Sequence, residues 1–454
     1  MSEHDGVTLC SIRWSEVFPW LGTLRSFRLA VTLRVLALGA AGLLLMLLGW
    51  SVIGGIFSGS EQAGELWKSQ FGTASAWGVI DQAVPTEHAP PVWSSPATVG
   101  QPALPGWWHF GDDPFTGTWL QLSRPVWQIF AGVYEPGRPV QPVSLAALLC
   151  WVLSALWGLA VWAFFGGAIS RIAAVQLACD EQVGWGASLR WAASKWLSYF
   201  GAPLFPLAGV VLAVLPLLVA GWIMRLDVGL LLAGLLWPLA LVGGLVMALL
   251  LLGLIFGWPL MWATISVEGT DTFDALSRAY AYVFQRPLRY LLYAVLAAVL
   301  GLLGWLLVEN FAAAVIWLGL WGAGWGAGAL REEAIRSGDL SGMGGGGVAL
   351  VGFWAGLVKW LAVGYFYGYF WTASTLIYYL LRRDVDGTEM DEVFLEADQS
   401  EKQFNLPPLA TETAAAPPAA ETAAPGASPE TPAKPQAAMS GDGPESPAKP
   451  PAAG

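Results

Sequence analysis

Two acidic side chains near the C-terminus have the types and spacing for phosphoryl transfer. They lie in the stretch Asp384-Val385-Asp386-Gly387-Thr388. In an Asp-x-Asp-Gly-Thr pattern, the first carboxylate can act as the nucleophile and the second as a general acid. The residues around the pattern decide whether the chain can position the two groups for that reaction.

The surroundings do not supply the scaffold of the haloacid-dehalogenase-type phosphatases, which use this pattern. In those enzymes the motif ends a buried strand, and an apolar residue and an α/β domain follow it. Here Arg382 and Arg383 precede the motif and Glu389 follows it. A calcium loop does not fit either, because its Gly belongs at the sixth position of a twelve-residue loop. We therefore expect no phosphoryl transfer and no metal at this motif.

A related phrase occurs earlier in the chain and suggests a structural role instead. Residues 267–271 and 385–389 both read Val, acid, Gly, Thr, acid, and each phrase follows an apolar run. Gly is favoured just after the end of a helix, and Thr followed by acids is favoured at the start of the next helix. The sequence therefore predicts a structural turn motif in both places, made by Gly269, Thr270, Gly387 and Thr388.

The composition is that of an integral membrane protein. Hydrophobic residues make up 56% of the 454 residues and charged residues 12%, whereas a soluble domain has about 25% charged residues. The net charge of −11 does not favour nucleic-acid binding. The three cysteines, Cys10, Cys150 and Cys179, have no paired spacing. They predict neither a disulfide framework nor a metal site, and we expect no cofactor.

Six apolar runs reach the roughly 20 residues that a membrane span needs. They are residues 28–57, 144–169, 200–224, 229–265, 289–307 and 359–381. The fourth run is overlong, with a helix break expected near Pro238 or Pro259. Residues 311–330 are a re-entrant segment, an interfacial segment or a continuation of the fifth span. The fold class is therefore all-α, a polytopic bundle of about six spans with interfacial helices.

The basic residues predict the orientation of the spans. With an inner N-terminus, the short inner segments carry 11 Lys and Arg and the outer segments carry six. Because Lys and Arg concentrate on the cytoplasmic side, we expect both termini in the cytoplasm and a location in the bacterial inner membrane. We therefore expect the chain to interact directly with the lipid bilayer.

Residues 58–143 form a Trp- and Pro-rich outer loop, and residues 123–134 within it suggest a short helix on the bilayer surface. A carbohydrate-binding surface lined by Trp is the alternative. His88, His109, Asp112 and Asp113 share this loop, and a metal site there is a weaker alternative.

An amphipathic segment follows the first turn motif. Within 272–286, apolar residues recur at helical spacing and predict a helix in the membrane interface, which we call an elbow. A fainter copy lies 88 residues earlier and would make spans two and three, and spans four and five, repeated helix–elbow–helix units. The predicted elbow residues are Phe273, Leu276, Arg278, Tyr280 and Phe284, and in the earlier copy Trp185, Arg190 and Trp196.

The segment ISVEGTDTFDALSRAYAYVFQRPLRYLL resembles the elbow of uncharacterised bacterial multi-pass membrane proteins. It is more loosely similar to the membrane domain fused to some glycerophosphodiester phosphodiesterases. The resemblance covers about residues 130–395 and implies a helical bundle. It implies no reaction, because the chain has no phosphodiesterase domain.

Three charged residues fall within or beside the apolar runs, where charges are functional candidates. Arg34 is expected to reach the cytoplasmic surface with its long side chain. Glu309 and Lys359 are expected at the outer ends of spans five and six. No series of acids typical of a proton relay accompanies them.

The chain thus divides into six parts: a cytoplasmic segment at 1–28, the first span at 29–57, the outer loop at 58–143, the membrane core at 144–381, an acidic segment at 382–397 and an Ala/Pro-rich tail at 398–454. The tail has 15 Ala and 12 Pro among 57 residues, a composition typical of disorder. We expect a non-enzymatic protein that organises the membrane, or binds membrane or cytoplasmic proteins through this tail. A transporter or channel, or a membrane-embedded enzyme, are the alternatives.

Overall fold

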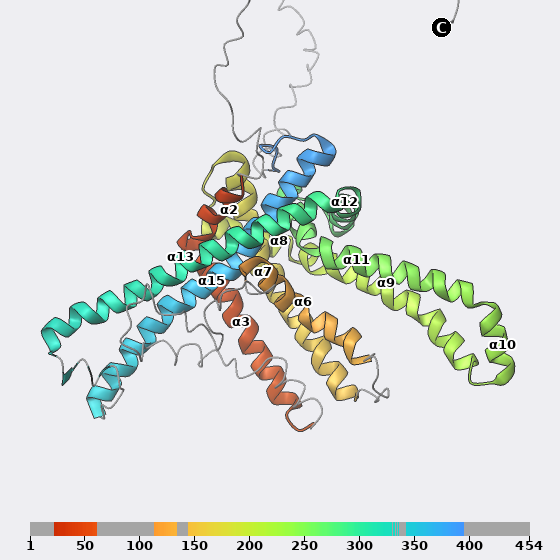
Figure 1. The fold of residues 1–454 in the computed structure, drawn as a ribbon, viewed down its shortest axis with the longest axis horizontal. Coiled ribbons are helices and arrows are strands. Elements are labelled where there is room, and N and C mark those ends of the chain that lie inside the picture. Colours follow the sequence, from red (N-terminus) through yellow and green to blue (C-terminus); the bar gives the residue numbers. More distant parts are fainter. Residues whose placement is uncertain are drawn as a thin grey trace, which may run out of the picture. The chain divides into compact units, whose positions relative to one another are not determined.

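A computed structural model describes residues 22–60, 113–133, 144–328, 330–331, 333, 335 and 342–394. These ranges hold eleven α-helices and no strand (Figure 1). The helices are α2 (Thr23–Ala30), α3 (Leu33–Phe57), α6 (Pro114–Val133), α7 (Leu145–Cys179), α8 (Trp185–Ser194), α9 (Trp196–Ile223), α10 (Asp227–Leu235), α11 (Trp237–Glu268), α12 (Thr272–Gln285), α13 (Pro287–Ala327) and α15 (Gly342–Asp386).

Six of these helices, α3, α7, α9, α11, α13 and α15, are long and apolar enough to cross a membrane. The all-α fold class is confirmed, and the chain is a multi-pass membrane protein. The first predicted run is divided at Val31 and Thr32, because Thr32 is extended (ψ 137°) and separates α2 from α3. The overlong fourth run is broken at Leu236, beside Pro238, whereas Pro259 lies inside α11. Of the segment 311–330, for which three alternatives were open, residues 311–327 continue the fifth span as part of α13.

One end of each candidate span meets the short helices α8 and α12, and we call this the elbow end of the bundle. Helix α8 joins the end of α7 to the start of α9, and α12 joins the end of α11 to the start of α13. Side-chain contacts bring the start of α3 and the end of α15 to the same place. The six spans therefore alternate in direction, as six consecutive membrane crossings must.

The second half of α15 is the centre of the bundle. Every residue from Tyr367 to Leu381 is buried, and α2, α3, α6, α7, α11 and α13 all pack against this helix. The rings of Trp262 and Trp371 stack with their centroids 4.4 Å apart. At the crossing of α3 and α15, a Cβ added to Gly364 would lie 2.3 Å from the Leu36 carbonyl oxygen. Only Gly allows the two backbones to approach this closely.

At two prolines inside the spans, a tryptophan side chain bonds to the backbone carbonyl that the proline leaves without its helical partner. Pro203 has no N–H for the Tyr199 carbonyl, which accepts a hydrogen bond from Trp262 Nε1 at 2.8 Å instead. Pro259 likewise leaves the Ile255 carbonyl free, and Trp119 Nε1 donates to it at 3.0 Å. Because an unsatisfied backbone carbonyl is costly in a membrane, these bonds help α9 to continue through Pro203 and α11 through Pro259.

The prediction of a surface helix at 123–134 is wrong in its extent. Helix α6 begins at Pro114, and its first turns are inserted into the bundle, with Phe115 6% exposed and packed against Phe370. Asp113 caps this helix by accepting hydrogen bonds from the Phe115 and Thr116 backbone N–H groups. Nearly all of residues 58–112 lie outside the described ranges, including His88, His109 and Asp112.

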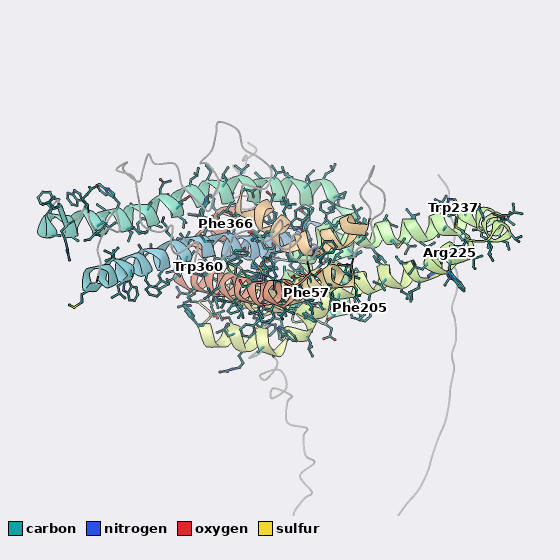
Figure 2. The ribbon with its side chains drawn as sticks, turned by 90° about the horizontal axis from the view of Figure 1, so that it is seen from below. Phe57, Phe205, Arg225, Trp237, Trp360 and Phe366 are labelled. Atoms are coloured by element: carbon teal, nitrogen blue, oxygen red, sulfur yellow. The ribbon has the colours of Figure 1, made fainter. Side chains whose placement is uncertain are left out.

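The α9–α10–α11 hairpin extends beyond the packed bundle (Figure 1). Figure 2 shows Arg225 and Trp237 beside α10 at its far end. In α10, Leu231 and Leu235 are each 78% exposed, and the adjoining parts of α9 and α11 are exposed as well. Such a surface requires a nonpolar surrounding, which the hydrocarbon of a bilayer provides.

Candidate functional site at the elbow end

Glu268, the last residue of α11, is the centre of a polar network at the elbow end. Its carboxylate accepts a hydrogen bond from Tyr378 at 2.6 Å and pairs with Arg278 at 2.8 Å and Arg382 at 3.3 Å. Arg278 also forms an ion pair with Asp274 in α12. Burial alone would lower the pKa of Arg278, but Glu268 and Asp274 outweigh it and raise this pKa. The network thus joins α11, α12 and α15.

Arg171 of α7 is buried and fixes the segment that follows α15. Its guanidinium donates to the carbonyl oxygens of Ser266 and Phe394, each at 2.7 Å, and lies 3.9 Å from the centre of the Trp191 ring. The Phe394 N–H donates to the Val267 carbonyl at 2.8 Å. Residues 387–394, which we call the strap, therefore fold back onto the end of α11.

The acids of the apparent phosphatase motif are held by structural partners. Asp384 lies within the last turn of α15, pairs with Arg289 at 2.7 Å and accepts a hydrogen bond from Tyr293 at 2.9 Å. Asp386 accepts a hydrogen bond from Tyr282. Burial and the Asp386 carboxylate raise the pKa of Tyr282 above its usual value, so this hydroxyl keeps its proton. Both acids thus connect α15 to the α12–α13 region.

The two glycines of the turn motif have the predicted left-handed backbone, with φ of 67° at Gly269 and 70° at Gly387. The predicted roles of the threonines are wrong. Helix α12 begins after Asp271 rather than Thr270, and Thr270 Oγ1 is buried with no hydrogen-bond partner in the described part. After Thr388 no helix begins within the described residues, because the strap packs against the bundle instead.

Both predicted elbows are present as helices, and their match at a spacing of 88 residues stays a prediction. Ala275 is fully buried, whereas its predicted counterpart Ala187 is exposed. Three buried positions agree at a spacing of 91 residues, which pairs Ser188 with Ala279, Trp191 with Tyr282 and Ala192 with Val283, but Ala275 then pairs with the exposed Gly184. The starts of α9 and α13, Trp196 and Pro287, are also 91 residues apart.

The remaining predicted elbow residues have different environments. Phe273 and Phe284 of α12 are 65% and 44% exposed, while Leu276 and Tyr280 are half-buried. In α8, Trp185 is 42% exposed and Arg190 is exposed. Trp196 belongs to α9 rather than to the elbow helix, and its Nε1 donates to the Ala160 carbonyl at 3.0 Å.

The three charged residues predicted within or beside the spans are all placed by the structure. Arg34 donates to the Val183 carbonyl at 2.8 Å, so it ties α3 to the α7–α8 connection rather than only extending to a surface. Glu309 and Lys359 lie in the interiors of α13 and α15, not at helix ends, and interact electrostatically with each other. Both helices, at 41 and 45 residues, are longer than one membrane crossing needs, so the position of Glu309 and Lys359 at the outer ends of spans five and six stays a prediction.

A cavity of about 480 Å³ lies between α3, α6, α7, α9 and α11. Its lining is almost entirely apolar and includes Met46, Trp50, Leu207, Leu254 and Trp258. In the described ranges, no three His, Cys, Asp or Glu side chains come together as a metal site would require.

Comparisons with protein families, with curated proteins and with solved structures find no match to this chain.

Proposed function

We propose that the chain is a non-enzymatic membrane protein that organises its surroundings in the bilayer and binds a protein partner through the tail at 398–454. Its elbow end would face the cytoplasm, as the excess of basic residues predicts. The observation that carries the proposal is that the acids of the elbow end are bound by structural partners. Glu268, Asp384 and Asp386 are all engaged by Arg or Tyr side chains.

The outward surfaces of the elbows support this proposal. Phe273 contacts Phe205 of α9, with ring centroids 4.4 Å apart, yet remains largely exposed. Trp185 and Phe284 are likewise exposed apolar side chains on the short helices. Aromatic side chains next to basic ones favour the interface between lipid headgroups and hydrocarbon. We infer that α8 and α12 lie in that interface and hold the ends of the spans at one depth.

The strap supports the location of partner binding. It brings residue 394 back against α7 and α11, so the residues after it start from a fixed place at the elbow end. A partner bound to the tail would therefore be tethered to the elbow end through residue 394. Capture of crosslinked proteins from cells, with the full chain and with a chain ending at residue 397, tests this. We expect at least one protein that requires the tail; identical capture by both chains would contradict the proposal.

A transporter or channel is the second candidate, favoured by the proline-containing α9 and α11 and by the paired elbows. Against it, the cavity beside these helices is lined almost entirely by apolar side chains, whereas a path for polar solutes needs polar groups. Swelling of vesicles containing the purified chain separates the two. We expect vesicles with the protein to be no more permeable to ions and small sugars than vesicles without it. A selective increase in permeability for one solute would favour transport.

A further inference from the structure

The cavity between α3, α6, α7, α9 and α11 is long and lies along the candidate spans. Its lining on α9 extends from Pro203 to Leu218, which is about 22 Å at 1.5 Å per residue. Its volume of about 480 Å³ is in the range of small-molecule sites, roughly 300–1,000 Å³. These dimensions suit an extended, flexible and apolar occupant.

The outer part of the cavity is accessible from the bilayer. Val211, Leu215 and Leu218 line the cavity and are nevertheless 50% to 62% exposed. An occupant can therefore enter sideways from the hydrocarbon without crossing the elbow end. Water alone is a poor occupant, because an ordered water needs two to four polar partners and this lining offers few.

Two polar atoms on the lining have no hydrogen-bond partner among the described residues, Ser154 Oγ and Trp258 Nε1, and of the two only the indole N–H can do nothing but donate. The indole N–H groups of the other lining tryptophans are all bonded: Trp50 to the Ser154 carbonyl, Trp162 to the Met46 sulfur and Trp262 to the Tyr199 carbonyl. Trp258 is only 9% exposed, and its Nε1 has no acceptor among the described residues. A buried N–H left without an acceptor costs about 1–3 kcal/mol. The missing partner is therefore a hydrogen-bond acceptor carried by whatever fills the cavity.

We propose that the cavity binds one aliphatic lipid chain whose carbonyl oxygen accepts a hydrogen bond from Trp258. Two sources supply this chemistry: the ester of a glycerophospholipid and the carboxyl group of a free fatty acid. The chain lies along α9 between Pro203 and Leu218, and the carbonyl sits at Trp258. The proposal rests on the protein being a membrane protein, but it does not depend on the tail or its partner.

Native mass spectrometry of the full chain in mild detergent tests the proposal. Oleic acid and palmitoyl-oleoyl-phosphatidylglycerol are added separately to delipidated protein. We expect one tightly bound molecule per chain for at least one of these probes, and which probe binds identifies the source of the carbonyl. Absence of a retained molecule with both probes would overturn the proposal.

Matched variants locate the bound chain. Leu207→Trp adds a large ring inside the cavity and should abolish retention, whereas Leu212→Trp, on the same helix but outside the lining, should not. Trp258→Phe should weaken binding about tenfold, the scale of one lost hydrogen bond. Trp371→Phe also removes an N–H without an acceptor, from a ring that packs against Trp258 and Trp262 but does not itself line the cavity, and should leave retention unchanged. Equal retention by Leu207→Trp and Leu212→Trp would overturn the site, and unchanged binding by Trp258→Phe would overturn the hydrogen bond.

A measurement on the wild-type protein tests the same site without depending on whether the variants fold. A diazirine-bearing fatty acid is crosslinked in membranes, and the labelled peptides are mapped. Labels should concentrate on 203–218 and 251–262, and unlabelled oleic acid should compete with them. Labels spread evenly over the exposed surfaces of α9 and α11 would overturn the proposal.

Discussion

The elbow end and the far part of the α9–α10–α11 hairpin are both rich in apolar residues, yet they are built on opposite principles. At the elbow end and in the adjoining half of α15, aromatic rings, glycines and ion-paired side chains pack against one another. In the far hairpin, Leu and Val side chains point outward, and Gly221, Gly234 and Gly244 have no neighbour within 4 Å of an added Cβ.

The difference shows that apolar residues can either pack inside the bundle or face the lipid, depending on the kinds of side chain. Burial inside a membrane protein depends on close packing and hydrogen bonds, because lipid is as apolar as a leucine side chain. Small residues and aromatic rings with polar atoms therefore mark the packed region, and branched aliphatic residues mark the lipid-facing region. The comparison can be tested by matched changes in the two regions.

The largest expected effect is at the crossing of α3 and α15. Gly364→Leu places a side chain where a Cβ alone would lie 2.3 Å from a backbone oxygen, so the helices must separate. Overpacking of this kind costs about 1–3 kcal/mol or more. Gly244→Leu in α11 is the control, because nothing lies near its added Cβ. Thermal stability in detergent should fall sharply for the first variant only; equal losses would contradict the contrast.

The next effect is at Glu268. Replacing it with Gln leaves Arg382, whose side chain is 11% exposed, without its buried anion. Breaking a buried ion pair from one side costs up to about 3 kcal/mol here. Asp227→Asn, at the exposed start of α10, should change stability by less than about 0.5 kcal/mol. Denaturation of both variants in the same detergent checks the difference, and a stable Glu268→Gln variant would show that the network is dispensable.

Replacing the two turn glycines should lower stability by different amounts. Gly269 and Gly387 both have positive φ, which costs another residue about 1 kcal/mol or more. An added Cβ at Gly269 would also lie 2.8 Å from the Phe394 ring, whereas none is near Gly387. Gly269→Val should therefore lower the melting temperature more than Gly387→Val. The reverse order would mean that the strap does not pack as described.

Much of the bundle could be predicted from the sequence, and the exceptions have physical causes. The six spans and the break beside Pro238 follow from apolar length and proline, which are local properties. The insertion of α6 was missed, because Phe115 and Thr118 are buried by contacts with distant helices rather than by a regular apolar period. The strap was missed for a similar reason, since Arg171 is 223 residues from Phe394, to which it donates.

The smallest predicted effect concerns pH. The pKa of Tyr282 is raised in the folded chain, so the folded state keeps this proton at a pH where the unfolded chain, with a pKa near 10, releases it. Its contribution to stability is thus complete below pH 10 and declines above it. Tyr282→Phe should reduce the loss of stability above pH 10 by up to about 1.4 kcal/mol per pH unit. Identical pH profiles from pH 8 to 11 would contradict the assignment.

The central claim is that the elbow end and the tip of the α9–α10–α11 hairpin lie on opposite sides of the membrane. Single cysteines at Ser277 in α12 and Asp227 in α10, in a chain with Cys10, Cys150 and Cys179 replaced by Ala, test it with a membrane-impermeant maleimide. In intact cells we expect labelling at residue 227 and protection at residue 277, and in inside-out vesicles the reverse. Labelling of both positions from the same side would contradict the account.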